Sequence, residues 1–375
     1  SFYQKNDGSL WSVGRNNYGQ LGDGTIINQS NPLQIVTGVT AFSNASHSMY
    51  IKSDGSLWTM GNNFYGQLGD GTIASRSTPV EIESSGVTSF SAGYAHGLYT
   101  KIDGSLWAMG INNYGQLGEG TTMDRSTPVQ IESSGVTAVS AGGNHSLYVK
   151  SDGSLWAMGG NNYGQLGDGT TSNRNVPVQI ESSGVTFVSA GGWHSLYIKS
   201  DESLWGMGSN GFGQLGDGTT TQRHTPVQIE SSGVSMVTNG NSFSMYVKSD
   251  GSLWGMGSNA YGQLGDGTTT QRHTPIQIEP SSVNSVSAGY THSVYNKSDT
   301  SFWAMGRNHS GQLGDGTTLT RTSPVQILDS NVSEISAGGD HSFYSKNDGS
   351  LWATGRNDHG QLGDGTTINK NVPIQ

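Results

Sequence analysis

The sequence contains no cysteine, which excludes disulfide bonds, cysteine-ligated metals and thiol chemistry. It is also poor in hydrophobic residues (32%) and in charged residues (12%). No stretch approaches the ~18 apolar residues that a membrane-spanning helix needs, so we predict no membrane span. The Ser-, Thr-, Asn- and Gly-rich remainder slightly favours a secreted or cell-surface bacterial protein, although it also fits the cytoplasm.

Glycine, by contrast, is abundant, with 57 copies in 375 residues, and it recurs in a repeated motif. The sequence Gly-Gln-Leu-Gly-Asp/Glu-Gly-Thr occurs eight times, at spacings of 47 residues once and 49 residues six times. A tryptophan precedes each copy and a proline follows it. Such self-similarity at a fixed period indicates a repeat architecture. We predict a single domain over residues 1–375, built from repeats of about 49 residues.

One repeat shows how each unit folds. It holds four β-prone segments, which we call strands A to D, at residues 136–142, 146–150, 154–159 and 176–180. An Asp-Gly pair between strands B and C predicts a tight hairpin, because glycine tolerates the positive φ that such turns require. A long glycine-rich loop separates strands C and D. A four-stranded meander cannot bury both faces alone, so neighbouring sheets must stack, and radial stacking gives a β-propeller.

The residue types also predict the order of the strands within each sheet, or blade. Strand A ends in small residues, which suit the axis where blades converge. Strand D carries a proline in every copy, and proline belongs on an edge because it cannot donate a ladder hydrogen bond. The tryptophan of strand C is expected to pack between blades. We predict an all-β propeller of four-stranded antiparallel blades. Eight blades are favoured, the first lacking its inner strand, and seven are the alternative.

The consensus VSAGxxHSLYxKSDGSLWxMGxNxYGQLGDGTT…PVQI resembles the repeat of the regulator of chromosome condensation family, and the resemblance covers the whole chain. Members of that family include a nucleotide-exchange factor, a plant ultraviolet-B photoreceptor and bacterial β-lactamase inhibitory proteins. The resemblance implies a propeller whose loops grip a protein partner. It does not fix an activity, since one fold serves many functions.

Charged residues follow the repeat. Of 18 basic residues, eight are hairpin lysines and seven lie between the glycine-rich motif and strand D, which leaves Arg15, Arg307 and Arg356. This regularity favours a structural role, and the alternative is a ring of arginines that grips an acidic partner. A net charge of −10 with interleaved acids argues against a nucleic-acid partner, which requires a concentrated basic face.

Six histidines precede strand B, at His47, His96, His145, His194, His292 and His341. Imidazoles at one level of a propeller raise the hypothesis of a metal site. The fifth copy has Phe243 instead, and the histidines are one blade apart, so a structural role is favoured. No nucleophile–base–acid pattern and no phosphate-binding loop is present. We therefore expect no enzyme activity, no catalytic residue, no metal and no cofactor.

Residues that break the repeat are better candidates for function. The pair before the strand-B histidine varies from Ala45-Ser46 to Gly339-Asp340 and includes three aromatic residues. We expect the A–B and C–D loops to share one face, and exposed aromatic and arginine side chains are frequent interface anchors. The predicted partner-binding residues are Trp193, Tyr94, Tyr290, Arg174, Arg223 and His224. The sequence thus predicts a protein-binding scaffold. The alternative is a regulatory protein, such as an enzyme inhibitor or a nucleotide-exchange factor. The partner and the oligomeric state stay open.

Overall fold

A computed structural model describes residues 1–44 and 46–375 of the chain, so Ala45, a member of the variable pair before His47, lies outside the described residues. Those residues form strands, turns and loops, with no helix among them. No described segment is thus a helix that could cross a membrane. The chain divides into two compact units, residues 1–200 with 223–226 and residues 201–222 with 227–375, which we describe separately.

Unit 1 begins with a three-stranded sheet and continues with four-stranded ones. Blade 1 comprises β1 (Phe2–Gln4), β2 (Leu10–Gly14) and β3 (Gln29–Val36). Blade 2 comprises β4 (Val39–Asn44), β5 (His47–Lys52), β6 (Leu57–Gly61) and β7 (Arg76–Glu83). Blade 3 comprises β8 (Val87–Ala92), β9 (His96–Lys101), β10 (Leu106–Gly110) and β11 (Arg125–Glu132). Blade 4 comprises β12 (Val136–Ala141), β13 (His145–Lys150), β14 (Leu155–Gly159) and β15 (Arg174–Glu181). The unit also holds β16 (Val185–Ala190) and β17 (His194–Lys199) of blade 5.

Unit 2 holds β18 (Leu204–Gly208) and the second half of β19 (Arg223–Glu230), followed by three complete blades. Blade 6 comprises β20 (Val234–Asn239), β21 (Phe243–Lys248), β22 (Leu253–Gly257) and β23 (Arg272–Glu279). Blade 7 comprises β24 (Val283–Ala288), β25 (His292–Lys297), β26 (Phe302–Gly306) and β27 (Arg321–Leu328). Blade 8 comprises β28 (Val332–Ala337), β29 (His341–Lys346), β30 (Leu351–Gly355) and β31 (Lys370–Ile374).

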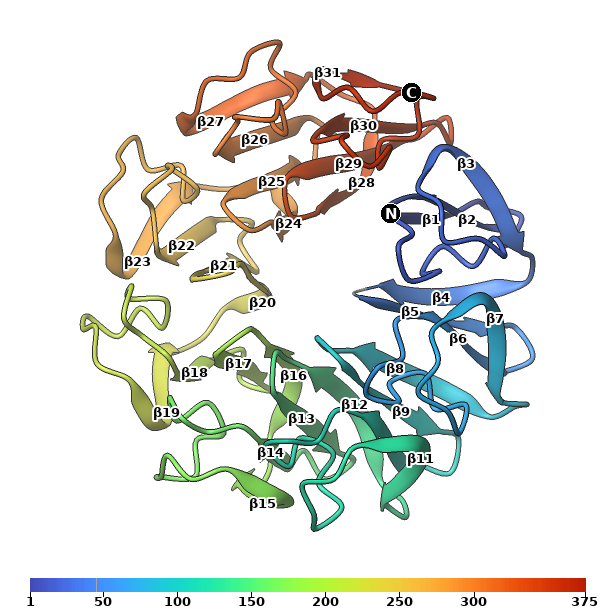
Figure 1. The fold of residues 1–375 in the computed structure, drawn as a ribbon. Coiled ribbons are helices and arrows are strands. Elements are labelled where there is room, and N and C mark those ends of the chain that lie inside the picture. Colours follow the sequence, from blue (N-terminus) through green and yellow to red (C-terminus); the bar gives the residue numbers. More distant parts are fainter. Residues whose placement is uncertain (45) are drawn as a thin grey trace. The chain divides into compact units, whose positions relative to one another are not determined.

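The predicted blade plan is confirmed. The strands form eight antiparallel sheets, each complete sheet follows the order A-B-C-D, and the first lacks strand A (Figure 1). Within unit 1, strand A of blade 4 contacts strand A of blades 3 and 5, as expected for inner strands. The predicted bounds were short by one or two residues for strands B and D. Strand B begins at His145, and strand D runs from Arg174 to Glu181, so residues that the sequence placed in loops are strand ends.

The turns follow the residue types that the sequence supplies. Between β13 and β14, Gly153 has φ +76° and its amide donates to the Lys150 carbonyl at 2.8 Å, while Asp152 accepts from the Ser154 amide at 2.9 Å. Between β14 and β15 the pairing register shifts after Ala157, so the ladder is interrupted by a bulge near Pro177. This bulge accommodates a residue that cannot donate to the ladder.

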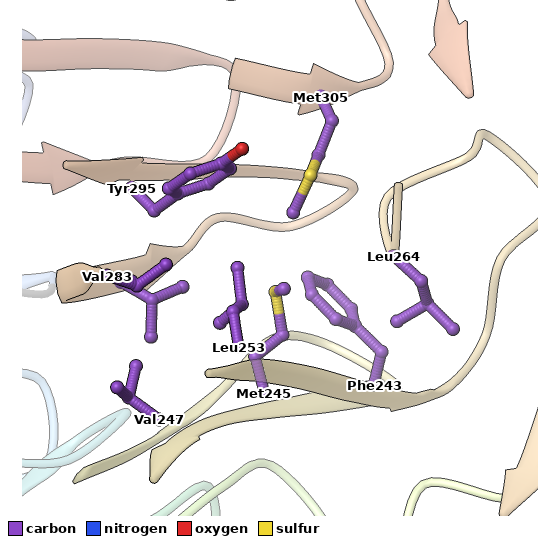
Figure 2. Close-up of a cluster of buried hydrophobic side chains, with 9 residues drawn as sticks. Phe243, Met245, Val247, Leu253, Leu264, Val283, Tyr295 and Met305 are labelled. Carbon is purple, nitrogen blue, oxygen red and sulfur yellow. The ribbon is translucent and has the colours of Figure 1, made fainter. Parts of the chain in front are cut away.

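The core consists of apolar layers between neighbouring blades. In unit 1, Leu98, Leu106 and Leu117 of blade 3 pack with Tyr148 and Met158 of blade 4, all fully buried. In unit 2, Figure 2 shows the corresponding layer between blades 6 and 7, with Met305 pointing towards Met245 and Phe243. The strand-C tryptophans pack against these layers as predicted, but they are only partly buried. The largest side chains that are completely buried are the strand-B tyrosines.

Candidate functional site

Backbone hydrogen bonds show which loops share an end of each blade. The Gly160 amide, just after strand C, donates to the Asn144 carbonyl of the A–B loop at 2.7 Å, and Arg307 makes the same bond to Thr291 at 2.9 Å. At the other end, the Ser151 amide of the B–C hairpin donates to the Gly135 carbonyl of the D–A turn at 2.8 Å. The A–B and C–D loops thus lie together in each of these blades, as predicted. We call this the loop end, and the opposite one the hairpin end.

The C–D loop of blade 4 is organised by one buried asparagine. The Asn161 amide group donates to Asp168 Oδ1 at 2.9 Å, and its carbonyl oxygen accepts from the Leu166 amide at 3.0 Å. Asp168 also accepts from the Thr170 hydroxyl at 2.8 Å and from Arg174 Nε at 2.6 Å. The Asn, Leu, Asp and Thr of the repeated motif therefore close the loop on itself. The motif is a structural one.

The arginines before strand D belong to the same bracing. Burial opposes ionisation of Asp70, but hydrogen bonds from Thr72 and Arg76 outweigh it and hold the pKa of that carboxyl below its usual value. Gln29 substitutes in blade 1, donating to Asp23 at 2.6 Å. Ion pairs between these loops and their basic residues include Arg76–Asp70, Arg125–Glu119, Arg174–Asp168, Arg272–Asp266, Arg321–Asp315 and Lys370–Asp364. These cations are neutralised internally, which favours the structural interpretation over a ring that grips acids.

The C–D loops of blades 1 to 7 also contact the next blade. The Gly169 amide donates to the His224 carbonyl at 2.8 Å, and the His224 ring packs so closely on Gly164 that a Cβ there would lie 2.5 Å from it. His224 therefore closes the side of the blade 4 loop, and Arg223, which precedes it, also has contacts of its own. The predicted residues Arg174 and His224 thus meet at one loop, both with structural partners.

Trp193 adds an exposed aromatic ring to the same loop. It is 43% exposed, and its ring meets Tyr163 edge-on, with 5.5 Å between centroids and 67° between planes. Tyr163 was not predicted, because a tyrosine or phenylalanine at this position is part of the repeat and gives no distinguishing signal. We call Trp193, Tyr163, Arg174 and His224 the blade 4 cluster.

The other two predicted aromatics lie elsewhere. Tyr94 belongs to the A–B loop of blade 3 and is 71% exposed. Tyr290, in unit 2, is 65% exposed and lies over Gly339, where a Cβ would come within 3.0 Å of the ring. The structure thus places each of them at the loop end of its own blade.

Three of the histidines before strand B, His96, His145 and His292, each contact a serine of the next blade. The Ser146 hydroxyl of β13 donates to the Gln116 carbonyl at 2.8 Å, so its lone pair accepts from His96 Nε2, 3.0 Å away. His145 and Ser195 repeat the contact at 2.9 Å. This arrangement places the proton on Nε2 and leaves the buried Nδ1 without a hydrogen-bond partner in His96 and His145.

Burial lowers the pKa of these imidazoles far below the usual value, to about 3 for His96 and His145 and to about 4 for His47 and His292. They are neutral at physiological pH. Within residues 1–44 and 46–375, no three His, Asp or Glu side chains gather as metal ligands would. His96, His145 and His292 instead link adjacent blades through their serine contacts.

A charged cluster in unit 2 was also missed. Arg356 pairs with Asp358 at 2.6 Å and approaches Asp340 at 3.6 Å, while Arg307 approaches Asp340 at 3.8 Å and lies over the Tyr261 ring at 5.4 Å. The available signal was that both arginines, like Arg15, occupy the same repeat position directly after strand C, where the other five blades carry Asn, Ile, Gly or Ser.

Comparisons with known proteins agree with this architecture. A family model described as the RCC1-like domain matches residues 1–246 and 85–375. Among curated protein sequences, none matches this chain. The fold resembles the crystal structure of human WBSCR16, at 24% identity and a TM-score of 0.69 over 85% of this chain and 93% of that one. It also resembles Prp20p from Saccharomyces cerevisiae, at 18% identity and a TM-score of 0.68 over 90% and 91%. Another Prp20 structure, that of yeast RCC1 bound by Kap60, matches at 17% identity and a TM-score of 0.66 over 99% and 84%. Because the family model spans the whole chain and the blades carry its repeat, this chain belongs to the RCC1-like domain family.

Proposed function

We propose that the chain is a protein-binding scaffold and that its partner docks at the loop end of blades 4 and 5, with Trp193 as the anchor. The observation that carries this proposal is that Trp193 is at once exposed and held in place. Its ring rests edge-on against Tyr163, so little side-chain freedom is lost when a partner covers it. Tryptophan, tyrosine and arginine are the residues that most often dominate binding energy.

The surroundings of Trp193 support a docking site. Tyr163 and Arg174 come from one braced C–D loop, and Arg223 and His224 adjoin it at the start of β19. Arg174 is 37% exposed although it is paired with Asp168, so it can still donate hydrogen bonds to a partner. We extend the proposal to Tyr94 and Tyr290 as further contacts of the same kind. The hairpin end, with its recurring Lys-Ser-Asp-Gly turns, offers little that distinguishes one blade from another.

The comparisons supply a precedent for protein binding. The Prp20p structure is described together with binding of that protein to Gsp1p and histones, and the second yeast structure contains Kap60. Protein partners are therefore recorded for proteins of this fold. For this chain we propose binding rather than catalysis, and a protein partner rather than nucleic acid. An extracellular or cell-surface location stays a prediction from composition, and a single domain over residues 1–375 stays a prediction from the repeat.

The test is quantitative recovery of the partner from the native source, using the wild-type chain, Trp193→Ala and Lys150→Ala as baits. We expect Trp193→Ala to weaken binding by roughly thirtyfold or more, the usual effect of a hot-spot truncation. Lys150→Ala, at the hairpin end, should change affinity by less than about threefold. Circular dichroism melting of each bait controls for folding. Loss of the partner with Lys150→Ala but not with Trp193→Ala would overturn the assignment of the loop end.

The same partner distinguishes the scaffold from a regulatory protein. If the purified partner is an enzyme, its activity is measured with and without the chain. If it binds a nucleotide, the rate of nucleotide release is measured in the same way. A change in either rate would establish the inhibitor or exchange-factor alternative.

A further inference from the structure

The loop ends of blades 1 and 2 form an apolar hollow that no repeat feature requires. Its volume is about 370 Å³. Its walls come from the two C–D loops, and its lining residues are Asn17, Tyr18, Ile26, Phe64, Ile73, Ala74, Ser75 and Ser77. We call it the blade 1–2 hollow.

Three large apolar side chains of this hollow face solvent. Ile26 is 66% exposed, Phe64 58% and Ile73 67%. The Phe64 ring meets Tyr18 edge-on, at 5.5 Å between centroids and 84° between planes, so the wall between the two loops is fixed. Exposed apolar groups that cluster around a concavity are typical of binding sites.

These side chains replace polar ones that the repeat uses elsewhere. The position of Ile26 and Ile73 is threonine in the other six copies, and no other copy has a large apolar residue at the position of Phe64. Blade 4 forms its C–D loop with Thr171 and Asn162 at these positions. The apolar residues are therefore not needed for folding of the loop.

The electrostatics of the hollow indicate which partner fits it. No charged side chain lines it, so it offers no opposite charge to an ionised group of a ligand. Arg15 lies two residues before Asn17. Among the residues that the structure describes, it is the one basic side chain that makes no ion pair, hydrogen bond or ring contact; the other lysines and arginines all make one. An uncharged hollow with an unpaired cation two residues from its lining complements an apolar side chain flanked by a carboxylate.

We propose that the blade 1–2 hollow binds an extended protein segment that inserts one large apolar side chain between Ile26, Phe64 and Ile73 and places an aspartate or glutamate against Arg15. A hollow of about 370 Å³ has room for one such side chain. This surface involves blades and residues other than the blade 4 cluster, so it does not depend on the docking site proposed around Trp193.

The probe is a phage library of random linear 12-residue peptides, selected on the immobilised wild-type chain. We expect the enriched peptides to share an aromatic residue or leucine next to aspartate or glutamate. Their affinity is then measured for the variant Ile26→Thr/Phe64→Asn/Ile73→Thr, which carries the residues that blade 4 uses. The matched control is Leu319→Thr/Ile368→Thr, which removes two similarly exposed apolar side chains from C–D loops of blades 7 and 8. Melting curves confirm that both variants fold.

The expected result is binding at least roughly tenfold weaker to the triple variant and unchanged within about twofold in the control. Arg15→Gln should weaken the acidic peptides roughly three- to tenfold and leave versions with alanine in place of the acid unaffected. Equal affinity for wild type and triple variant, or peptides without the apolar–acidic pair, would overturn the proposal. So would sedimentation showing a wild-type dimer that the triple variant loses, because the occupant would then be a second copy. If Trp193→Ala abolishes peptide binding, the peptides bind at the blade 4 cluster and the proposal is wrong.

Discussion

The interface between blades 3 and 4 and the interface between blades 1 and 2 solve the same packing problem differently. Between blades 3 and 4, the Tyr148 hydroxyl donates to Glu132 at 2.6 Å and Lys150 pairs with the same carboxylate at 2.9 Å. His96 adds its contact with Ser146. Two polar links thus join these blades, one near strand D and one near the inner strand.

The interface between blades 1 and 2 has neither link. The glutamate position is Val36, and Phe2 and Phe42 pack at 6.3 Å beside the buried Leu10 and Tyr50. Lys52, which has no carboxylate at that position to pair with, lies 4.4 Å from the Trp58 ring, whereas the paired Lys150 lies 4.9 Å from Trp156. The apolar layer is common to both interfaces and the polar links are not. We infer that apolar burial holds the blades together and that the links adjust this stability, so a blade can lose its links without losing its place.

The largest expected effect is on stability in acid, and it tests the histidine links. The pKa of the buried imidazoles lies at about 3 to 4 in the folded chain, against ~6.5 when unfolded. The unfolded state therefore binds more protons between these values, and stability falls as pH drops from about 6.5 towards 4. The loss is about 1.4 kcal/mol per pH unit for each histidine that titrates. Denaturant unfolding at pH 7, 6, 5 and 4.5 measures it, and a flat profile would contradict the burial.

Two histidine variants sharpen this test. Both nitrogens of His47 are buried without a partner, because blade 3 has Gly97 where other blades have the accepting serine. The chain itself uses Phe243 at this position in blade 6. His47→Phe should therefore raise stability by about 1–2 kcal/mol at pH 5, whereas His145→Phe loses the link to Ser195 and should gain less. Equal effects of the two changes would mean that the serine contact contributes nothing.

The next effect concerns the tyrosine link. Burial, and then the neighbouring Glu132, raise the pKa of Tyr148, and burial alone raises that of Tyr50, so both hydroxyls stay protonated. Tyr148→Phe removes a hydrogen bond to a carboxylate and should lower the free energy of unfolding by about 1–3 kcal/mol. Tyr50→Phe removes no such bond and should change it by less than about 0.5 kcal/mol. Urea unfolding of the two variants at pH 7 decides this. If Tyr50→Phe lowers the free energy of unfolding as much as Tyr148→Phe does, the hydrogen bond to Glu132 is not what distinguishes the two interfaces.

The repeat predicts the strands, their order and the eight blades, because each rests on residues that recur in most or all copies. The proline of strand D and the Asp-Gly of the hairpin each act through their own backbone, so one sequence suffices to interpret them. The loop face was predicted from strand direction alone. These features are local, or follow from connectivity.

The polar links were not predicted, since each joins residues from different repeats. Glu132 meets Tyr148, and His96 meets Ser146, only after two blades stack. The residues of the candidate site likewise fall into those that the sequence predicted and those that it did not. The sequence singled out Trp193, which breaks the repeat, but not Tyr163, which conforms to it and becomes relevant only through their contact. It also counted Arg174 as available, whereas the fold pairs it with Asp168.

The smallest effect extends the comparison to the hairpin turns. Gly153 has φ +76°, and the equivalent residue in blade 5 is Glu202, which adopts φ +61°. A residue with a Cβ is strained in this left-handed region by about 1 kcal/mol, and glycine is not. The Glu202 side chain recovers little, since its contact with the Ser249 hydroxyl at 3.0 Å is exposed. Glu202→Gly should therefore raise the free energy of unfolding by about 0.5–1 kcal/mol, because the release of strain outweighs the greater freedom of glycine in the unfolded chain.

Gly153→Glu is the reciprocal variant. It should lower the free energy of unfolding by at least about 1 kcal/mol, because a Cβ at Gly153 would also lie 2.5 Å from the Gly184 amide. Urea unfolding of both variants measures the two changes in the free energy of unfolding. If Glu202→Gly destabilises the chain, the glutamate has a role at this turn that outweighs its backbone strain.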